Sequence, residues 1–460
     1  MTPGGKRELS VTLGSRIVVL AIMLATQSAL AWWLGVADRG AYGICSVYAV
    51  LLSVLLGLGT DIAVSYFVSA GKCSASQGLT AALLFGVVAS LVAAAVLGVL
   101  TLVKPSFFSK VALVDMVLAT GLCGVLGWSS SLHRLLTSVR AFGWYSALWV
   151  IKAVVELVLV VLFVWAWQWG VTGALISKIV IECLVCIGVV IVLTKHYGAG
   201  LQWPGVPRIT GIIHYGIRYY GAKVGGEFSL QMGLAMAAMW LTLEDVGLLA
   251  VATAMMARTM VIPDTLVSVL LPRVSADPDG RGELIRRCLQ LTLVSCTLVL
   301  GMVVVFAKPF VIVFFSPSFL PAVGLIQMLM AAAMVTSVGK IITPYLLGTN
   351  RPGTYSLAMV AGIAINAMLI WSLLGLAGIW AVVWGTLGGA VLTTAIQLIA
   401  YLRGTSLPLR SLFVVSRDDM RQGLRWLGLR RGDEELQVEG VSATVPATVS
   451  NIPLTRQRDN

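Results

Sequence analysis

Long apolar stretches separated by short polar segments dominate this 460-residue chain from residue 13 to residue 402. A helix needs about twenty apolar residues to cross a hydrocarbon core of about 30 Å, because it rises about 1.5 Å per residue. The pattern therefore predicts an all-α polytopic membrane protein with about twelve transmembrane helices. The predicted spans are 13–36, 42–69, 78–103, 111–136, 144–166, 171–194, 211–240, 245–272, 286–306, 320–347, 355–374 and 378–402.

The first span carries an unusual charge and has a counterpart in the second half of the chain. Arg16 lies about one turn inside it, and Asp38-Arg39-Gly40 predicts a tight turn at its end. Arg218 lies similarly near the start of a span that ends at Asp245-Val246-Gly247. A cleaved signal peptide is the alternative, but the apolar run continues past the position where cleavage would occur. We interpret the span as part of the fold.

The two halves of the chain match in order and spacing. Asp38-x-Gly40 corresponds to Asp245-x-Gly247, 207 residues later, and two other glycine-containing turns recur at offsets of 210 and 205. These matches predict two pseudo-symmetric six-helix bundles around a central cavity, inserted in the same orientation because six is even. The predicted organisation is an N-terminal bundle (1–194), a cytoplasmic linker (195–210), a C-terminal bundle (211–402) and a basic cytoplasmic tail (403–460).

The composition agrees with this class. The chain is 58% hydrophobic and 11% charged, whereas soluble proteins have about 25% charged residues. In such a chain a net charge of +12 reports cytoplasmic loops and tails rather than nucleic-acid binding. The seven cysteines lie mostly in apolar spans and the three histidines form no metal motif, so the sequence predicts no metal and no cofactor.

Basic loop residues predict that both termini lie in the cytoplasm. Alternating loops then place eleven basic residues inside and four outside, before the basic tail is counted. The inside set is Lys6, Arg7, Lys72, Arg140, Lys195, Arg208, Arg273, Arg281, Arg286, Arg287 and Arg351, and the outside set is Arg39, Lys104, Lys110 and Lys308. In the tail, apolar residues alternate with arginines over 407–431. This segment predicts an amphipathic helix on the anionic inner leaflet, with a solvated basic tail as the alternative.

Charged groups inside the spans are the most informative positions, because each costs about 2.5–3.5 kcal/mol at bilayer depth. Three Lys-x-x-x-Glu pairs can neutralise each other along one helix face: Lys152/Glu156, Lys178/Glu182 and Lys223/Glu227. The remaining groups are mainly basic and predict a positively charged cavity suited to phosphate, pyrophosphate or carboxylate. They are Arg16, Arg134, Arg218, Arg258 and Lys340, against Asp61 and Asp264, which could partner Arg16 and Arg258.

Short motifs spread over the first 402 residues give the chain a family resemblance. They are Gly14-Ser15-Arg16, Leu34-Gly35, Asp38-Arg39-Gly40-Ala41-Tyr42, Leu58-Gly59, Gly143-x-Tyr145 and Gly353-x-Tyr355-Ser356. With these motifs the chain resembles the multidrug/oligosaccharidyl-lipid/polysaccharide (MOP) exporter superfamily, and within it the Wzx-type O-antigen and exopolysaccharide flippases. The resemblance implies two bundles with alternating access, and a polyprenyl-pyrophosphate-linked oligosaccharide moved to the outer leaflet of a bacterial inner membrane.

The resemblance also suggests roles for the charged residues, by location only. Substrate-binding candidates are Arg16, Arg218, Arg258, Lys340 and Arg134, and coupling-ion candidates are Asp61, Asp264 and Glu227. The expected partners are the lipid-linked anionic oligosaccharide, membrane lipids and polysaccharide polymerase or glycosyltransferase machinery.

Two other functions are considered. A cation-coupled multidrug antiporter of the same superfamily would use Asp61 or Asp264 to bind Na⁺ or H⁺, although the excess of basic groups argues against it. A membrane enzyme such as a glycan polymerase would need a large external loop. No predicted outside loop exceeds roughly fifteen residues, so we predict a transporter and not an enzyme.

Overall fold

The computed structural model describes residues 3–103, 110–261, 263–264, 266–267, 281–349 and 351–405, with helices in every part of that range. The long elements are α1 (Pro3–Gly57), α2 (Thr60–Ser69), α3 (Ala75–Val103), α4 (Leu113–Ser138), α5 (Phe142–Val160), α6 (Gly170–Tyr197), α7 (Val206–Trp240), α8 (Leu243–Thr259), α10 (Arg281–Val305), α11 (Ala307–Phe315), α12 (Ala322–Gly348), α13 (Pro352–Ala377) and α14 (Ile379–Thr405). A π-helical turn, Val161–Ala166, extends α5, and a 3-10 turn, Pro317–Phe319, follows α11. The predicted amphipathic segment, 407–431, lies outside the described residues.

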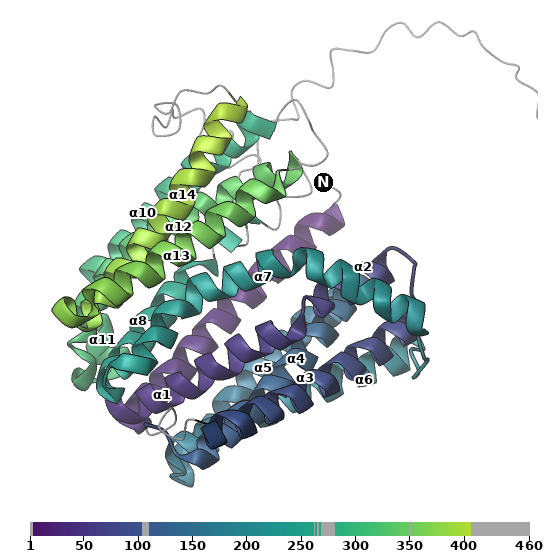
Figure 1. Cartoon of the computed structure of the whole chain (residues 1–460), viewed down its shortest axis with the longest axis horizontal. Coiled ribbons are helices and arrows are strands. Elements are labelled where there is room, and N and C mark those ends of the chain that lie inside the picture. The colour runs from purple at the N-terminus through teal and green to yellow at the C-terminus, as the bar shows by residue number, and fades with distance from the viewer. Residues whose placement is uncertain are drawn as a thin grey trace, which may run out of the picture. The chain divides into compact units, whose positions relative to one another are not determined.

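The helices gather in two groups joined by a third set (Figure 1). α3, α4, α5 and α6 pack beside one another, as do α10, α12, α13 and α14. α1 contacts both α7 and α8, and α2 contacts α7, so these four helices connect the groups. Two apolar clusters fill the first group and two fill the second. This arrangement is the predicted all-α fold; the exact bundle boundaries stay a prediction.

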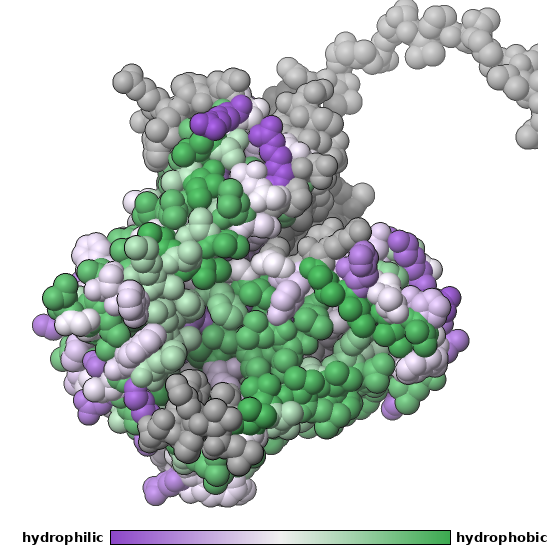
Figure 2. Space-filling model, viewed as in Figure 1, coloured by the Kyte–Doolittle hydropathy of each residue, from purple (hydrophilic) through white to green (hydrophobic). Residues whose placement is uncertain are grey.

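The outer surface of the helices is apolar, as a bilayer-spanning protein requires. Leu376 is 88% exposed and Trp371 is 73% exposed, and Figure 2 shows hydrophobic residues over the middle of one face with hydrophilic ones at its edges. Nine helices of the described residues are long and apolar enough to span a membrane. One of them, in α1, is 40 residues long and covers most of two predicted spans, while α7 carries four charged residues.

The predicted turn at Asp38-Arg39-Gly40 is wrong. These residues are helical, and the break between the first two spans lies at Gly35, where φ is 75°. Only glycine adopts this left-handed backbone readily, so Gly35 absorbs the change of direction and the next helix begins before residue 38. Arg39, predicted to lie in an external loop, is consequently a buried residue of α1 with 4% of its surface exposed.

A second break separates α1 from α2 and positions an acid. Leu58 and Gly59 both have positive φ, of 45° and 69°, so the helix stops and restarts at Thr60. Asp61 therefore lies in the first turn of α2. The amide dipoles of a helix N-terminus stabilise a negative charge there, which is one reason that a carboxylate is tolerated at this depth.

The crossing of α1 and α8 is symmetric at the level of single residues. A Cβ added to Gly40 would overlap the carbonyl oxygen of Leu243, and a Cβ added to Gly247 would overlap that of Val36. Gly40 and Gly247 are 207 residues apart, and so are Val36 and Leu243. The two repeats therefore meet here through equivalent backbone positions, and this contact confirms the register inferred from the glycine turns.

Near this crossing, the α3–α4 connection also binds the C-terminus of α7. The Lys110 ammonium donates to the last carbonyl groups of that helix, at 3.0 Å (Ala238), 3.3 Å (Met239) and 2.7 Å (Leu241). A cation at a helix C-terminus is stabilised by the helix dipole. Burial lowers the pKa of Lys110, and no carboxylate forms an ion pair with it within the described part of the chain. Lys110 thus ties the first group of helices to α7.

Substitution of either crossing glycine by alanine should lower thermal stability in detergent. The added methyl group must displace backbone rather than a flexible side chain, and overpacking of this kind costs about 1–3 kcal/mol. Gly121→Ala in α4 is the matched control, because a Cβ there meets nothing within 4 Å and alanine favours the helix. Equal melting temperatures for Gly40→Ala, Gly247→Ala and Gly121→Ala would contradict the close crossing.

Candidate functional site

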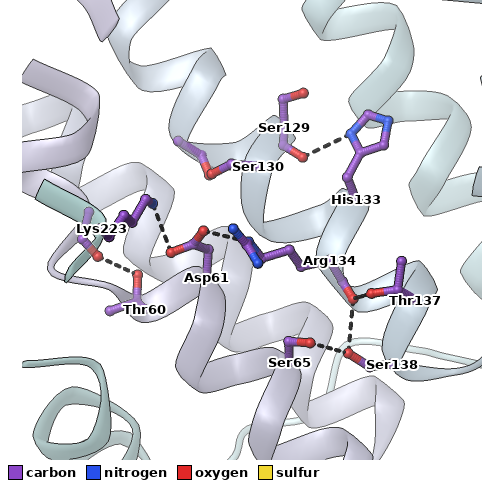
Figure 3. A network of polar contacts seen from close by, with 12 residues as sticks. Thr60, Asp61, Ser65, Ser129, Ser130, His133, Arg134, Thr137, Ser138 and Lys223 are labelled. Carbon is purple, nitrogen blue, oxygen red and sulfur yellow. Dashed lines mark hydrogen bonds and ion pairs between the residues drawn. The ribbon is translucent and has the colours of Figure 1, made fainter. Parts of the chain in front are cut away.

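Asp61 lies at the centre of a charged cluster formed by α2, α4 and α7 (Figure 3). Its Oδ1 atom is 2.9 Å from Lys223 Nζ of α7, and its Oδ2 atom is 2.8 Å from Arg134 Nε of α4. The Asp61 side chain is only 3% exposed, whereas those of Lys223 and Arg134 are 15% and 50% exposed. One buried carboxylate therefore compensates two basic groups, whose outer ends remain open to an incoming ligand.

Neighbouring hydroxyl groups hold α2 against α4 beside this cluster. Ser138 Oγ donates to the Arg134 carbonyl oxygen at 2.9 Å and lies 2.7 Å from Ser65 Oγ of α2. Thr60 Oγ1 donates to the Gly57 carbonyl oxygen at 2.7 Å and so satisfies part of the broken helix end. These contacts fix the backbone on both sides of the Asp61–Arg134 ion pair (Figure 3).

The second repeat contains a counterpart of this ion pair. Asp264 Oδ1 lies 2.6 Å from Lys340 Nζ of α12. Asp264 follows Asp61 by 203 residues and Lys340 follows Arg134 by 206, so each repeat joins equivalent helices through an acid and a base. Asp264 is more exposed than Asp61, at 56% of its side chain. The expected partnership of Asp264 or Asp61 with Arg258 is absent from the ion pairs of the described residues.

The predicted pairs within single helices are wrong, because each lysine binds a carboxylate on another helix. Lys152 of α5 is 2.5 Å from Glu182 of α6, and Lys178 of α6 is 2.7 Å from Glu156 of α5. Ser129 Oγ of α4 also donates to Glu182, at 2.7 Å. Spacing of four places both members of a pair on one face, and that face here meets the equivalent face of a neighbouring helix.

Glu227 loses its predicted partner in the same way. Lys223 binds Asp61, and within the described residues Glu227 has neither an ion pair nor a hydrogen bond. It remains in an electropositive environment, within electrostatic range of Lys223, Lys340 and Arg134. Glu227 is therefore the one predicted coupling acid in the described structure whose carboxylate is not already bound by a basic side chain.

Two guanidinium groups lie apart from these pairs. Arg258 Nη1 is 3.5 Å from Met23 Sδ of α1. Arg39 donates to Gln27 Oε1 of α1, and its guanidinium lies 5.2 Å from the centre of the Tyr42 ring. The sequence placed Arg39 outside the membrane because the helix break was expected three residues too late. The only signal that could have corrected this was Gly35 itself, which permits the break.

Arg16 and Arg218 belong to α1 and α7, and their side chains are not among those described. The repeat register at Gly40 and Gly247 nevertheless bears on the prediction that these two arginines are equivalent. At the same spacing of 207 residues, the counterpart of Arg16 is Lys223. The residue that binds Asp61 is thus the true partner of Arg16 in the repeat.

A groove of about 450 Å³ lies between α1 and α11 and is lined by Ala25, Ser28, Ala29, Trp32, Trp33, Val313 and Phe314. Ser28 Oγ donates to the Phe314 carbonyl oxygen there. The lining is apolar and contains none of the charged candidates, so the groove is separate from the charged cluster.

Asp61→Asn should destabilise the protein more than Lys223→Gln. The first change removes the charge that compensates two cations, while the second leaves Arg134 paired with Asp61. Removing one partner of a buried pair costs about 3–5 kcal/mol, and less is expected where a partner is half exposed. Thermal unfolding should also show Asp61→Asn with Lys223→Gln to be less damaging than the sum of the two. Strict additivity would mean that the 2.9 Å contact contributes nothing.

The sequence matches a known protein family. Residues 29–324 fit the family model described as "Polysaccharide biosynthesis protein". No curated protein sequence matches the chain.

The fold is similar to solved transporter structures. An inward-facing multidrug resistance MATE family transporter of the MOP superfamily has a TM-score of 0.67 at 14% identity, over 85% of this chain and 99% of that one. The Vibrio cholerae MATE transporter VcmN in its bent form has a TM-score of 0.55 at 15% identity, over 91% and 98%. The eukaryotic MATE transporter AtDTX14 has a TM-score of 0.56 at 14% identity, over 90% and 99%. At such identities the likeness shows the fold alone.

Proposed function

Because this chain belongs to the polysaccharide biosynthesis protein family, we propose that it is a flippase for a polyprenyl-pyrophosphate-linked oligosaccharide. The cargo would move from the cytoplasmic to the outer leaflet of the bacterial inner membrane. The observation that carries this proposal is the family match over residues 29–324 in a chain with the MOP transporter fold. The family and the similar structures are those of multi-pass membrane transporters rather than enzymes.

The charges of the helices support an anionic cargo. Four basic side chains on the connecting and neighbouring helices, Arg134, Lys223, Arg258 and Lys340, accompany three acids, Asp61, Glu227 and Asp264. Arg258 has no ion-pair partner within the described residues. A pyrophosphate group would supply the missing negative charge and form charge-assisted hydrogen bonds with such side chains.

The mechanism we propose is alternating access between the two bundles. The sugar headgroup passes between the bundles while the prenyl tail stays in lipid, since burying the tail's apolar surface in a charged cavity would gain nothing. Binding of the headgroup anion neutralises the cavity and lets the bundles change their contacts. The α1–α8 crossing at Gly40 and Gly247 must separate for the opposite side to open.

The location and partners follow from this function. Both termini lie in the cytoplasm in our proposal, because basic loop residues concentrate on that side. Membrane lipids surround the bundles, and polymerase or glycosyltransferase machinery supplies and consumes the cargo.

A cation-coupled multidrug antiporter is the second candidate, favoured by the MATE transporters among the similar structures. It would need a carboxylate available to bind a cation. Asp61 and Asp264 are each within 3 Å of a basic nitrogen, so binding Na⁺ or H⁺ there would first require breaking an ion pair. The flippase is therefore the better-supported function.

Reconstituted wild-type protein should flip a fluorescent polyprenyl-pyrophosphate-linked oligosaccharide across proteoliposomes, measured by quenching from the outer leaflet. It should not move cationic drugs such as ethidium. Arg218→Ala and Arg258→Ala should reduce flipping at unchanged protein level, whereas Lys195→Gln, at an exposed position near the end of α6, should not. Drug transport without lipid flipping would replace the flippase by the antiporter.

If transport is coupled to a proton gradient, Glu227 should carry the coupling, because its carboxylate is the one left without a basic partner. Glu227→Gln should then abolish the pH dependence of flipping in the same assay. Asp61→Asn and Asp264→Asn should keep that dependence even if they slow transport. Loss of pH dependence in Asp61→Asn alone would assign the coupling to the cluster in Figure 3 instead.

A further inference from the structure

Arg39 and Arg258 place two guanidinium groups along one face of the first half of α1. Arg258 contacts Met23, and Arg39 reaches back past the Gly35 break to Gln27. Met23 and Gln27 are four residues apart, so they share a helix face and are separated by about 6 Å along the axis. Both have part of their surface exposed, and this face of α1 is therefore open to a ligand.

Neither guanidinium has its charge compensated within the described structure. Each has a buried Nε atom with no hydrogen-bond partner, and neither forms an ion pair. The carboxylate that acts on Arg258 is that of Glu156, which Lys178 already binds at 2.7 Å. Arg39 interacts with a neutral amide and an aromatic ring, and it is also close enough to Arg258 for the two charges to repel.

This arrangement is costly unless an anion completes it. Burying a charge without a partner is strongly unfavourable, and a second like charge nearby adds to the cost. The other buried cations of the membrane-spanning helices avoid it, since Lys152, Lys178 and Lys223 each bind a carboxylate. An arginine pair is also the side-chain combination best suited to binding phosphate oxygens in a bidentate manner.

We propose that Arg39 and Arg258 together form the binding site for the pyrophosphate of the cargo, with Gln27 as a further hydrogen-bonding group. The proposal rests on the flippase function and names where its anionic group binds. Two phosphates match two guanidinium groups. Arg39 is adjacent to Gly40, so the anion lies next to the α1–α8 crossing that must open for release.

This site differs from the Asp61 cluster in one respect that can be measured. At Asp61 the cations already have a carboxylate, so an anion must compete with it. At Arg39 and Arg258 an anion removes a repulsion. Replacement of Arg39 by a neutral residue should consequently weaken anion binding and, without ligand, leave the protein as stable as wild type or more so. A purely structural arginine would behave in the opposite way.

The test uses the full-length protein in phosphatidylcholine nanodiscs with farnesyl pyrophosphate as the probe and farnesol as the uncharged control. Affinity and melting temperature are measured for the wild type, Arg39→Gln, Arg39→Lys, Arg258→Gln and Arg134→Gln. Arg39→Gln and Arg258→Gln should each weaken farnesyl pyrophosphate binding roughly 10- to 100-fold, the range for one charge-assisted hydrogen-bonding group. Arg39→Lys should lose less, and Arg134→Gln should bind nearly as the wild type does.

Several results would overturn the site. They are unchanged affinity in Arg39→Gln, a loss in Arg134→Gln as large as that in Arg258→Gln, or equal binding of farnesol. If Arg39→Gln fails to fold, that outcome shows a structural role for Arg39 and counts against the proposal, and Arg258→Gln and Arg39→Lys still report on binding. Tight binding that disappears when phosphatidylglycerol is added to the nanodiscs would identify a lipid headgroup phosphate as the occupant.

Failure of the site and failure of the flippase function remain distinguishable. A wild-type protein that flips the lipid-linked oligosaccharide while Arg39→Gln binds farnesyl pyrophosphate normally would refute only the site. A wild-type protein that neither flips this cargo nor binds the probe would refute the function as well.

Discussion

The cost of a charge inside a membrane determines how the charged helices of this protein contact one another. A lone ionised group at bilayer depth is unfavourable by several kcal/mol, so each one must find a partner or a ligand. The chain meets this requirement mostly between helices: α5 binds α6 through two crossed ion pairs, α2 binds α4 and α7 through Asp61, and Asp264 binds α12. Because lipid provides no hydrophobic drive for helices to associate, such pairs also select which helices become neighbours.

Backbone breaks and close glycine contacts give these pairs their geometry. The positive φ angles at Leu58 and Gly59 begin a new helix and place Asp61 in its first turn. The break at Gly35 turns Arg39 into the protein interior. At the α1–α8 crossing, Gly40 and Gly247 let equivalent backbone segments touch, which larger residues would prevent. Repeat symmetry in the sequence is thereby expressed as a symmetric contact in space.

The fold alone does not decide what is carried, since the same architecture occurs in MATE transporters. The distribution of free charge is more informative. Acids that are already bound by lysine or arginine are poor sites for a cation, while guanidinium groups without carboxylates are suited to phosphate. Arg258 and Arg39 are of the second kind. Together with the polysaccharide biosynthesis family, this chemistry favours an anionic lipid-linked cargo over a cationic drug.

The sequence by itself determined the membrane class, the approximate spans and the repeat. Apolar length reports directly on bilayer thickness, and glycine turns at a nearly constant offset report on duplication. It also identified the ionisable residues within the spans, since their cost does not depend on packing. Only the tertiary structure decided which of them meet. Lys152, Lys178 and Lys223 could each reach a glutamate four residues along their own helix, yet each binds a carboxylate of a neighbouring one. Helical spacing fixes the face on which a side chain lies, but the packing of helices fixes what faces it, and for Arg39 that depended on a break at Gly35 rather than at the expected turn.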